Sequence, residues 1–243
     1  EAAVAVGPLA YFLWLSMPPG CNEFQDRECP ELRLWVTDGT SDGTRRVATT
    51  DLWPAGQLTA AGSRLFFTSA GRLWVSDGTT SGTRRLSTVS DVHDLTAVGD
   101  GVVFQGCRAA TGCEPWLSDG TPAGTRLIKD ITAGGGDSAI RGLTAVGDRV
   151  FFDVLADDVD ETWTLWVSDG TPDGTTPVAD VRAIEATAVG DLLVFSADDG
   201  DGWEPWVSDG TPDGTLMLAD IHPYHGSDAY AFTPLRSGVV FVA

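Results

Sequence analysis

One short pattern returns five times along this chain and constrains its fold more than any other feature. Asp-Gly-Thr follows a tryptophan-containing run in LWVTDGTSDGT, LWVSDGTTSGT, PWLSDGTPAGT, LWVSDGTPDGT and PWVSDGTPDGT. Successive copies lie 39 to 50 residues apart. A period near 40 residues predicts one supersecondary unit, repeated along the chain and packed against its neighbours.

A second pattern precedes each of these copies. In LTAVGDRVFF, residues 143–152, two apolar runs flank Gly-Asp, and similar segments occur at 58–67, 95–104 and 186–195. Glycine supplies the positive φ of a two-residue type I′ or II′ hairpin turn. The uncharged segment AVAVGPLAYF at 3–12 matches the same frame, so we expect a hairpin there and not a membrane helix.

Each unit therefore reads as four strands, named A to D. In the fourth unit they are expected at 143–147, 149–154, 165–168 and 175–180. No amphipathic helical stretch of ten residues is present in the sequence, and 42% of the side chains are hydrophobic. Four strands per repeat predict an all-β protein, a β-propeller of four-stranded antiparallel blades.

The repeats also predict the domain organisation. We expect residues 1–243 to form a single propeller domain, with five complete repeats and a partial sixth A–B hairpin. Either the array continues beyond this half unit, or the terminal strands complete one another. The complete repeats span 3–50, 57–91, 95–131, 143–181 and 186–221, and the partial one spans 232–243.

The recurring residues have structural roles in this interpretation. The aspartate accepts backbone N–H groups of a C–D turn, and the glycines allow backbone angles closed to other residues. The tryptophan packs between neighbouring sheets, where its ring buries about 150–250 Å². These structural positions are Trp35, Trp74, Trp116, Trp166 and Trp206, with Asp38, Asp77, Asp119, Asp169 and Asp209.

These motifs resemble the ELWxxDGT repeat family, bacterial secreted or surface proteins with β-propeller-like arrays. The resemblance covers nearly the whole chain and implies architecture and secretion but no reaction. Two units have Glu-Pro-Trp in place of Glu-Leu-Trp, at 114–116 and 204–206, and three units lack this glutamate. That departure leaves the role of the glutamate open.

Charge and motif content exclude several functions. A formal charge of −20 disfavours binding to a phosphate backbone, so we expect no nucleic-acid partner. The sequence has no G-x-S-x-G, H-E-x-x-H or G-x-x-x-x-G-K motif. We therefore predict no catalytic residues, no enzymatic activity and no required cofactor.

The four cysteines form two local pairs, Cys21 with Cys29 and Cys107 with Cys113, each within a polar stretch read as a loop. Disulfides in these pairs are favoured over free thiols or another pairing, because neither pair has the CxxC spacing of zinc or redox sites. Two disulfides indicate an oxidising compartment, so the expected location is secreted, periplasmic or at the cell surface.

The differences between units gather at one end of the predicted sheets, in the B–C and D–A connections. Three tryptophans outside the repeat pattern, Trp53, Trp163 and Trp203, are placed on these loops as candidate ligand-binding residues, the alternative being that they cover the ends of the core. The leading hypothesis is a non-catalytic binding module that recognises a protein or a glycan there. A structural scaffold within a larger surface protein or assembly is the alternative, and a propeller-type glycoside hydrolase is third.

Two weaker metal signals lie in the same connections. Acidic loops could hold Ca²⁺, although they lack the spacing of an EF-hand, and a solvated acidic loop is the alternative. His222 and His225 form an H-x-x-H that weakly suggests a transition metal. The calcium candidates are Asp157, Asp158, Asp160, Asp198, Asp199 and Asp201, with Glu161 beside the first three.

Overall fold

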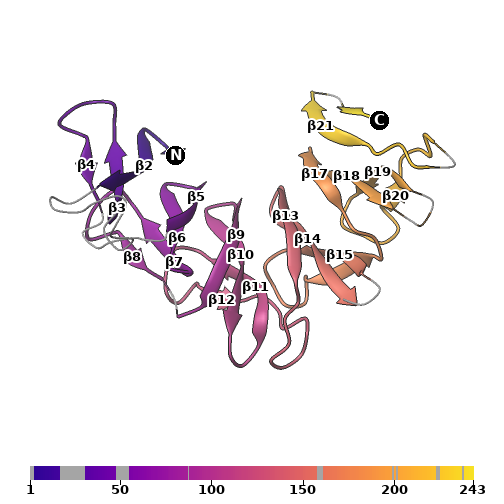
Figure 1. Cartoon of the computed structure of the whole chain (residues 1–243), viewed down its shortest axis with the longest axis horizontal. Helices are drawn as coiled ribbons and strands as arrows, with labels where there is room; N and C mark the ends of the chain where they lie inside the picture. Colours follow the sequence, from indigo (N-terminus) through magenta and orange to yellow (C-terminus); the bar gives the residue numbers. More distant parts are fainter. Residues whose placement is uncertain are drawn as a thin grey trace, which may run out of the picture. The chain divides into compact units, whose positions relative to one another are not determined.

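A computed structural model describes residues 3–16, 31–47, 55–86, 88–157, 161–198, 200, 202–222, 225–236 and 238–243. Every regular element in these ranges is a strand, as the repeats predict. The strands form five antiparallel sheets of four strands and one of two, each ordered along the chain (Figure 1). No helix in the described part of the chain is long and apolar enough to cross a membrane.

The strands follow the predicted A–B–C–D order in each four-stranded sheet. The first sheet contains β1 (Ala3–Val6), β2 (Leu9–Ser16), β3 (Glu31–Thr37) and β4 (Arg45–Arg46), and the second β5 (Ala55–Ala61), β6 (Arg64–Ser69), β7 (Arg72–Ser76) and β8 (Arg84–Arg85). The third contains β9 (Ser90–Val98), β10 (Gly101–Arg108), β11 (Gly112–Ser118) and β12 (Arg126–Leu127). The fourth contains β13 (Ile140–Val146), β14 (Arg149–Asp157), β15 (Thr162–Ser168) and β16 (Thr176–Ala179). The fifth contains β17 (Ile184–Val189), β18 (Leu192–Asp198), β19 (Trp203–Ser208) and β20 (Thr215–Met217), and the last β21 (Tyr230–Leu235) and β22 (Gly238–Val242).

Glycine makes the A–B turns, as the sequence predicts. Val146 pairs with Arg149 across Gly147 and Asp148, and Gly147 has φ +63° whereas Asp148 has no positive φ. Only the first central residue is left-handed, which identifies a type II′ turn. The sequence allows a type I′ or a type II′ turn, and the structure contains a type II′ turn here.

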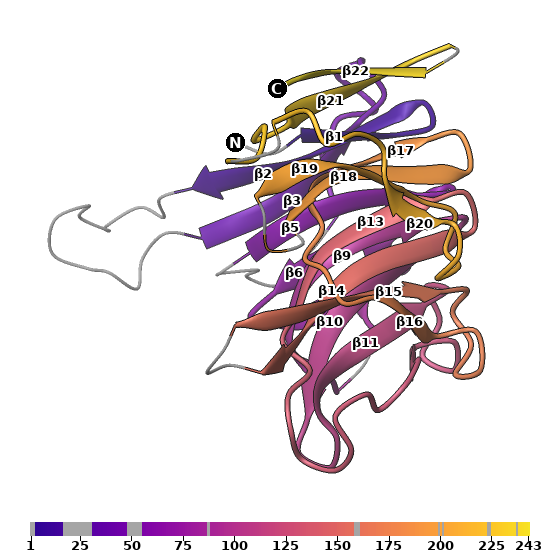
Figure 2. The same ribbon diagram turned by 90° about the vertical axis from the view of Figure 1, so that its right-hand side faces the viewer.

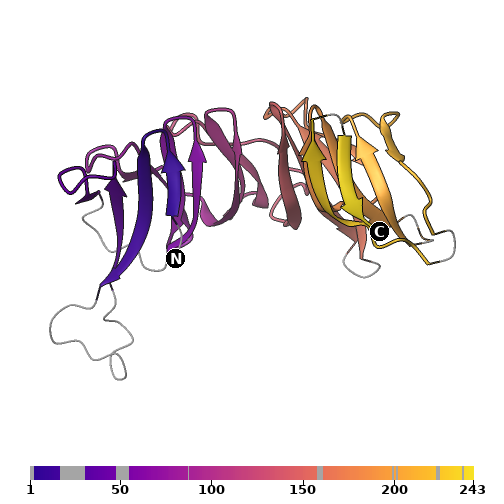
Figure 3. The ribbon, with the colours of Figure 1, turned by 90° about the horizontal axis from the view of Figure 1, so that it is seen from above.

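The chain divides into two compact units, residues 1–108 with 116–126 and residues 109–115 with 127–243. In unit 1 the sheets follow one another side by side, with strands β1, β5 and β9 adjacent (Figures 1 and 3). In unit 2 strands β13, β17 and β21 are adjacent in the same way (Figure 2). Each unit is therefore a stack of sheets.

The stacking uses two distinct faces of each sheet. The downstream face packs against the next sheet, as Tyr11 and Val36 do against Leu65 and Phe67. The upstream face, which carries Phe67, packs against the preceding sheet. The same pattern joins Phe151 to Phe195 in unit 2, and Val194 to Val239 and Phe241. Alternation of side chains along each strand produces the two faces.

The repeated tryptophans lie on the upstream faces. Phe67 and Trp74 pair across β6 and β7 and stack with ring centroids 6.0 Å apart, and Phe195 and Trp206 repeat this at 6.4 Å. Trp74 and Trp206 also pack against the cores formed with the preceding sheets. The predicted packing between sheets is thus present at both of these positions.

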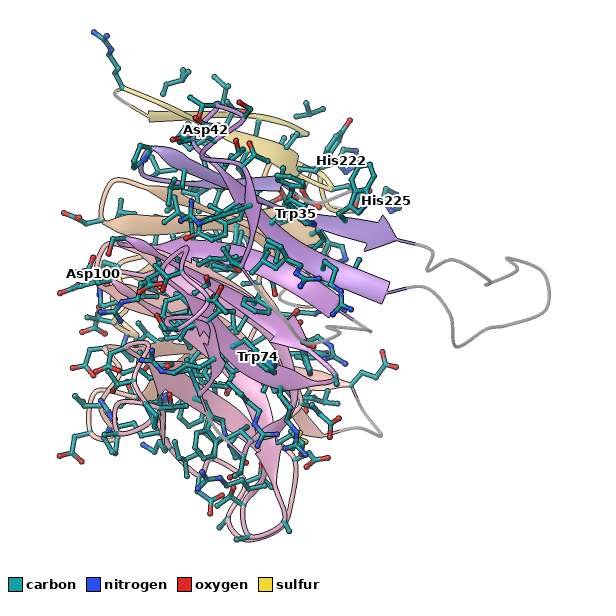
Figure 4. The ribbon with its side chains drawn as sticks, turned by 90° about the vertical axis from the view of Figure 1, so that its left-hand side faces the viewer. Trp35, Asp42, Trp74, Asp100, His222 and His225 are labelled. Atoms are coloured by element: carbon teal, nitrogen blue, oxygen red, sulfur yellow. The ribbon has the colours of Figure 1, made fainter. Side chains whose placement is uncertain are left out.

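The two ends of the sheets differ as the topology requires. Figure 4 shows Asp42, in a C–D turn, and Asp100, in an A–B turn, at the same end of unit 1, with Trp35 and Trp74 between the ends. We call the end of the sheets that carries the A–B and C–D turns the turn end. The opposite end, which carries the B–C and D–A connections, is called the loop end.

Some expected loops are strands in the structure. Trp163 lies in β15 and Trp203 begins β19, so their assignment to loops is wrong. Both stand three residues before a repeated tryptophan, and strand pairing extends further toward the loop end than the apolar pattern indicates. Cys107 and Cys113 likewise lie in β10 and β11, and both are disulfide-bonded.

Candidate functional site

The five C–D turns are built by one hydrogen-bond pattern. Asp77 Oδ1 accepts the N–H of Thr79 at 2.9 Å and its hydroxyl at 2.7 Å. Thr79 Oγ1 accepts the N–H of Gly82, and the Ser76 and Thr83 hydroxyls are 2.7 Å apart. The turns at Asp38, Asp119, Asp169 and Asp209 repeat these contacts. The repeated polar residues are therefore hydrogen-bond partners of one another and of the turn's main chain.

The two glycines of the turn are required for different reasons. Gly78 has φ +89°, in the region that favours glycine. Gly82 lies directly under the Asp77 carboxylate, where a Cβ would collide with both oxygens. The hydrogen bond from the Thr79 hydroxyl holds the pKa of Asp77 below its ordinary value, so the acceptor remains ionised.

Arginines connect neighbouring sheets through these turns. Arg45 Nη2 donates to the carbonyl of Gly78 in the next sheet at 2.9 Å, and Arg84 Nη2 donates to Gly120 at 3.2 Å. In unit 2, Arg149 Nη1 donates to Asp209 at 2.5 Å. Each of these three turns thus closes its own hairpin and receives an arginine from the preceding sheet.

The glutamate of Glu-Pro-Trp organises a D–A connection. Glu114 is fully buried and accepts the N–H groups of Ile131 and Thr132 and the hydroxyl of Ser138. Burial raises the pKa of Glu114, and these hydrogen bonds oppose the rise. Glu204 makes the corresponding contacts with Ile221, His222 and Ser227. This assigns the role that the sequence leaves open.

A glycine pair brings each of these connections close to its sheet. Gly112 and Gly202 stand two residues before the two glutamates, and a Cβ on either would collide with main chain at Gly136 or Gly226. The signal is present in the sequence as G-x-E-P-W followed by Asp-Ile 16 and 17 residues after the glutamate. Only a comparison of whole units, including the D–A connections, could have found it.

The loop end of unit 2 contains a cavity of about 760 Å³. It brings together Trp163 and Trp203, two of the predicted residues, and Arg182, whose guanidinium lies 4.9 Å from the Trp163 ring centroid. Glu161, Asp180 and Asp198 complete its charged lining. The indole face of Trp163 is thus covered by a cation of the same chain. A ligand-binding role for Trp163 and Trp203 stays a prediction.

Asp153 is a buried acid that the sequence analysis did not single out. It lies in β14 with 2% of its surface exposed, and Oδ1 accepts the N–H of Ala183 at 3.1 Å. Desolvation raises its pKa to about 7, although the Ala183 N–H and the positive charge of Arg182 oppose the rise. Thr68, Gln105 and Ser196 occupy the corresponding positions in other sheets and are also buried. Only a comparison of this B-strand position between units would have identified it.

The other candidate residues are not assembled into a metal site within the described ranges. Asp198 Oδ1 accepts the N–H groups of Gly200 and Gly202, and the rings of His222 and His225 lie 5.6 Å apart (Figure 4). No group of three or more potential metal ligands occurs among the described side chains. Asp157 lies in β14. Trp53, Asp158, Asp160, Asp199, Asp201 and the Cys21–Cys29 pair lie outside the described residues.

No family model matches the chain, and no curated protein matches its sequence. Its fold is similar over 99% of its length to solved structures that include puromycin hydrolase (16% identity, TM-score 0.54), the β-propeller domain of the Trilobed protease from Pyrococcus furiosus (11%, 0.58) and the acylaminoacyl peptidase of Pyrococcus horikoshii (12%, 0.55). The chain spans 43%, 76% and 42% of these chains, respectively.

These similarities establish a β-propeller fold and correct the functional expectation. The structures are a propeller domain of a protease and two longer chains, a hydrolase and a peptidase, and none is described as a module that recognises a protein or a glycan. The binding-module hypothesis is therefore wrong, and the glycoside-hydrolase reading is withdrawn with it. A scaffold is compatible with the findings. What the comparisons show of this chain is its fold, as repeated propeller sheets.

Proposed function

We propose that this chain is a structural scaffold segment of a larger surface protein or assembly, with no reaction of its own and no required cofactor. It comprises five four-stranded propeller blades and half of a sixth, and belongs to the ELWxxDGT repeat family. The disulfide involving Cys107 and Cys113 supports an oxidising, extracytoplasmic location.

The observation that carries the proposal is the repeated contact between neighbouring sheets. Arg45, Arg84 and Arg149 each donate to a turn carbonyl of the following sheet. The acceptor is main chain in every case, and apolar faces are buried beside it. The contacts that recur in this chain join one sheet to the next, and such contacts suit a segment that maintains the shape of a larger protein.

Cross-linking mass spectrometry on intact source cells tests this function. A scaffold predicts cross-links from this chain to a neighbouring protein, and an isolated complex that buries more than about 1,000 Å². Recovery of the chain without cross-links to any other protein would contradict the proposal. The control is a matched sample in which the protein is solubilised from the cells before cross-linking. It measures the cross-links that arise from chance encounters.

A further inference from the structure

A second cavity, of about 410 Å³, lies between the fourth and fifth sheets, within unit 2. Its walls are residues 141–144 of β13 and residues 184–186 of β17, the adjacent A strands of these two sheets. Asp153 of β14, 2% exposed, forms its buried end, and Arg182 and Ala183 complete the lining. Cavities of about 300–1,000 Å³ hold small molecules in other proteins.

The fold does not require an acid at the buried end of this cavity. Thr68 and Ser196 occupy the position of Asp153 in the second and fifth sheets, and both are neutral and buried. The hydrogen bond from the N–H of Ala183 to Asp153 Oδ1 is one that a hydroxyl oxygen can accept as well. A carboxyl group is costly to bury. Its presence where neutral residues suffice therefore points to a binding role.

The second oxygen of Asp153 borders a space that Gly142 leaves open. A Cβ on Gly142 would lie 3.6 Å from Asp153 Oδ2 and 3.8 Å from the carbonyl oxygen of Ala183. Because Gly142 has no side chain, a ligand atom in this space can approach both oxygens at once. Two acceptors, one of them an acid, select an N–H donor, and a positively charged ammonium group most strongly.

Positive charge lies beside these two acceptors. Arg141 lines the cavity and donates through Nη1 to the carbonyl of Ile140 at 3.2 Å. A guanidinium has five N–H groups, so Arg141 can bind a carboxylate at the same time. The guanidinium of Arg182 lies 4.9 Å from the ring centroid of Trp163, which holds a second positive charge at the edge of the cavity. The lining thus matches both ends of a small zwitterion.

We propose that this cavity binds a free α-amino acid. The ammonium group lies between Asp153 Oδ2 and the carbonyl of Ala183, and the carboxylate lies on Arg141. Leu143 and Ala186, also in the lining, provide apolar contact for the side chain. The inference goes beyond the scaffold function and does not depend on it.

Ionisation of Asp153 gives this binding a characteristic pH dependence. Burial raises the pKa of Asp153 to about 7, although the Ala183 N–H and the charge of Arg182 oppose the rise. The other charged groups that line the cavity are Arg141 and Glu185. An ammonium group pairs with the ionised carboxylate, so the affinity should increase from about pH 6 to about pH 8. Binding near pH 6 should release protons from Asp153.

Thermal unfolding of the full chain with each standard L-amino acid, at about 10 mM, tests the site, because a bound ligand raises the Tm of the folded state. At least one amino acid should raise the Tm at about pH 8. Acetate and methylamine each have only one of the two charged groups and should leave the Tm unchanged. Isothermal titration calorimetry then measures the Kd of the amino acid that raises the Tm most.

Two variants assign the binding to this cavity. Asp153→Asn and Arg141→Gln should each raise the Kd at least about tenfold, because each removes one partner of a charged pair. Asp148→Asn and Arg236→Gln are the matched controls, since they make the same charge changes at exposed residues outside the cavity and should bind like wild type. Thermal melting without ligand verifies that each variant is folded.

Three results would overturn the proposal. The cavity binds no amino acid if none raises the Tm or gives a heat of binding. Equal stabilisation by acetate or methylamine would show a site for a simple ion. An unchanged Kd in both cavity variants would place the binding elsewhere. The scaffold function is tested by cross-links on cells, so each of these results leaves it standing.

Discussion

The hydroxyl of Ser138 lies 2.5 Å from both carboxylate oxygens of Glu114, 24 residues earlier in the chain. The same carboxylate accepts two main-chain N–H groups, from Ile131 and Thr132. One buried side chain thus replaces the strand partners that this D–A connection lacks. It explains how two main-chain N–H groups and the Ser138 hydroxyl find an acceptor in a segment that has no strand partner.

Replacement of Glu114 should loosen this connection selectively. Glu114→Ala leaves two N–H groups and a hydroxyl without their acceptor, at a cost of about 1–3 kcal/mol each where water cannot enter. Hydrogen exchange measured by mass spectrometry should become faster over residues 130–138. Glu204→Ala is the matched control: it should accelerate exchange over 220–228 and leave 130–138 unchanged, and uniform acceleration in both variants would contradict the local role.

The C–D turn should be sensitive at its second glycine. In Gly82→Ala, the new Cβ collides with the Asp77 carboxylate, so the turn must open or the carboxylate must leave Thr79. We expect a loss of about 1–3 kcal/mol in the free energy of unfolding, measured by urea denaturation. Asp42→Ala, at an exposed position in the first C–D turn, should change stability by less than about 0.5 kcal/mol. Equal losses in both variants would argue against the packing of carboxylate on glycine.

Asp153 should make stability depend on pH. Its folded pKa, about 7, is above the ordinary value of 3.8, so the folded state binds more protons between these pH values. Stability is therefore highest below pH 4 with respect to this group, and falls as pH rises toward 7, by at most about 4 kcal/mol. Urea denaturation at pH 5 and pH 8 measures the fall.

The matched variant for this dependence is Asp153→Asn, which cannot ionise and should flatten the change between pH 5 and 8. Asp148→Asn, in the exposed A–B turn, should retain the wild-type profile. An unchanged profile in Asp153→Asn would show that another group is responsible.

The contact between sheets should be measurable at Arg84. Arg84→Ala removes the donor to the Gly120 carbonyl, and we expect a loss of about 1 kcal/mol in the free energy of unfolding. Arg85→Ala is the control, because the side chains of adjacent strand residues alternate, and Arg85 therefore lies on the opposite face of β8 from Arg84. If both changes have the same effect, charge alone would account for it.

The sequence predicted the elements where a local rule is repeated. Gly147 marks a hairpin by its backbone freedom, and Asp77 marks a turn by its hydrogen bonds, so both are readable from a few neighbouring residues. The sequence places Trp163 in a loop because it lies outside the apolar run. In the structure, strand pairing extends past that run and includes Trp163. The partnership of Glu114 with Ser138 and the burial of Asp153 depend on contacts between distant segments, which spacing within one motif does not reveal.

The use of carbonyl oxygens as the acceptors for Arg45 and Arg84 has an evolutionary consequence. Any residue supplies a carbonyl, so a duplicated unit finds an acceptor on its new neighbour without a compensating substitution. Copy number can therefore change by unequal recombination while each new junction remains compatible, and side chains at the variable end are free to diverge afterwards.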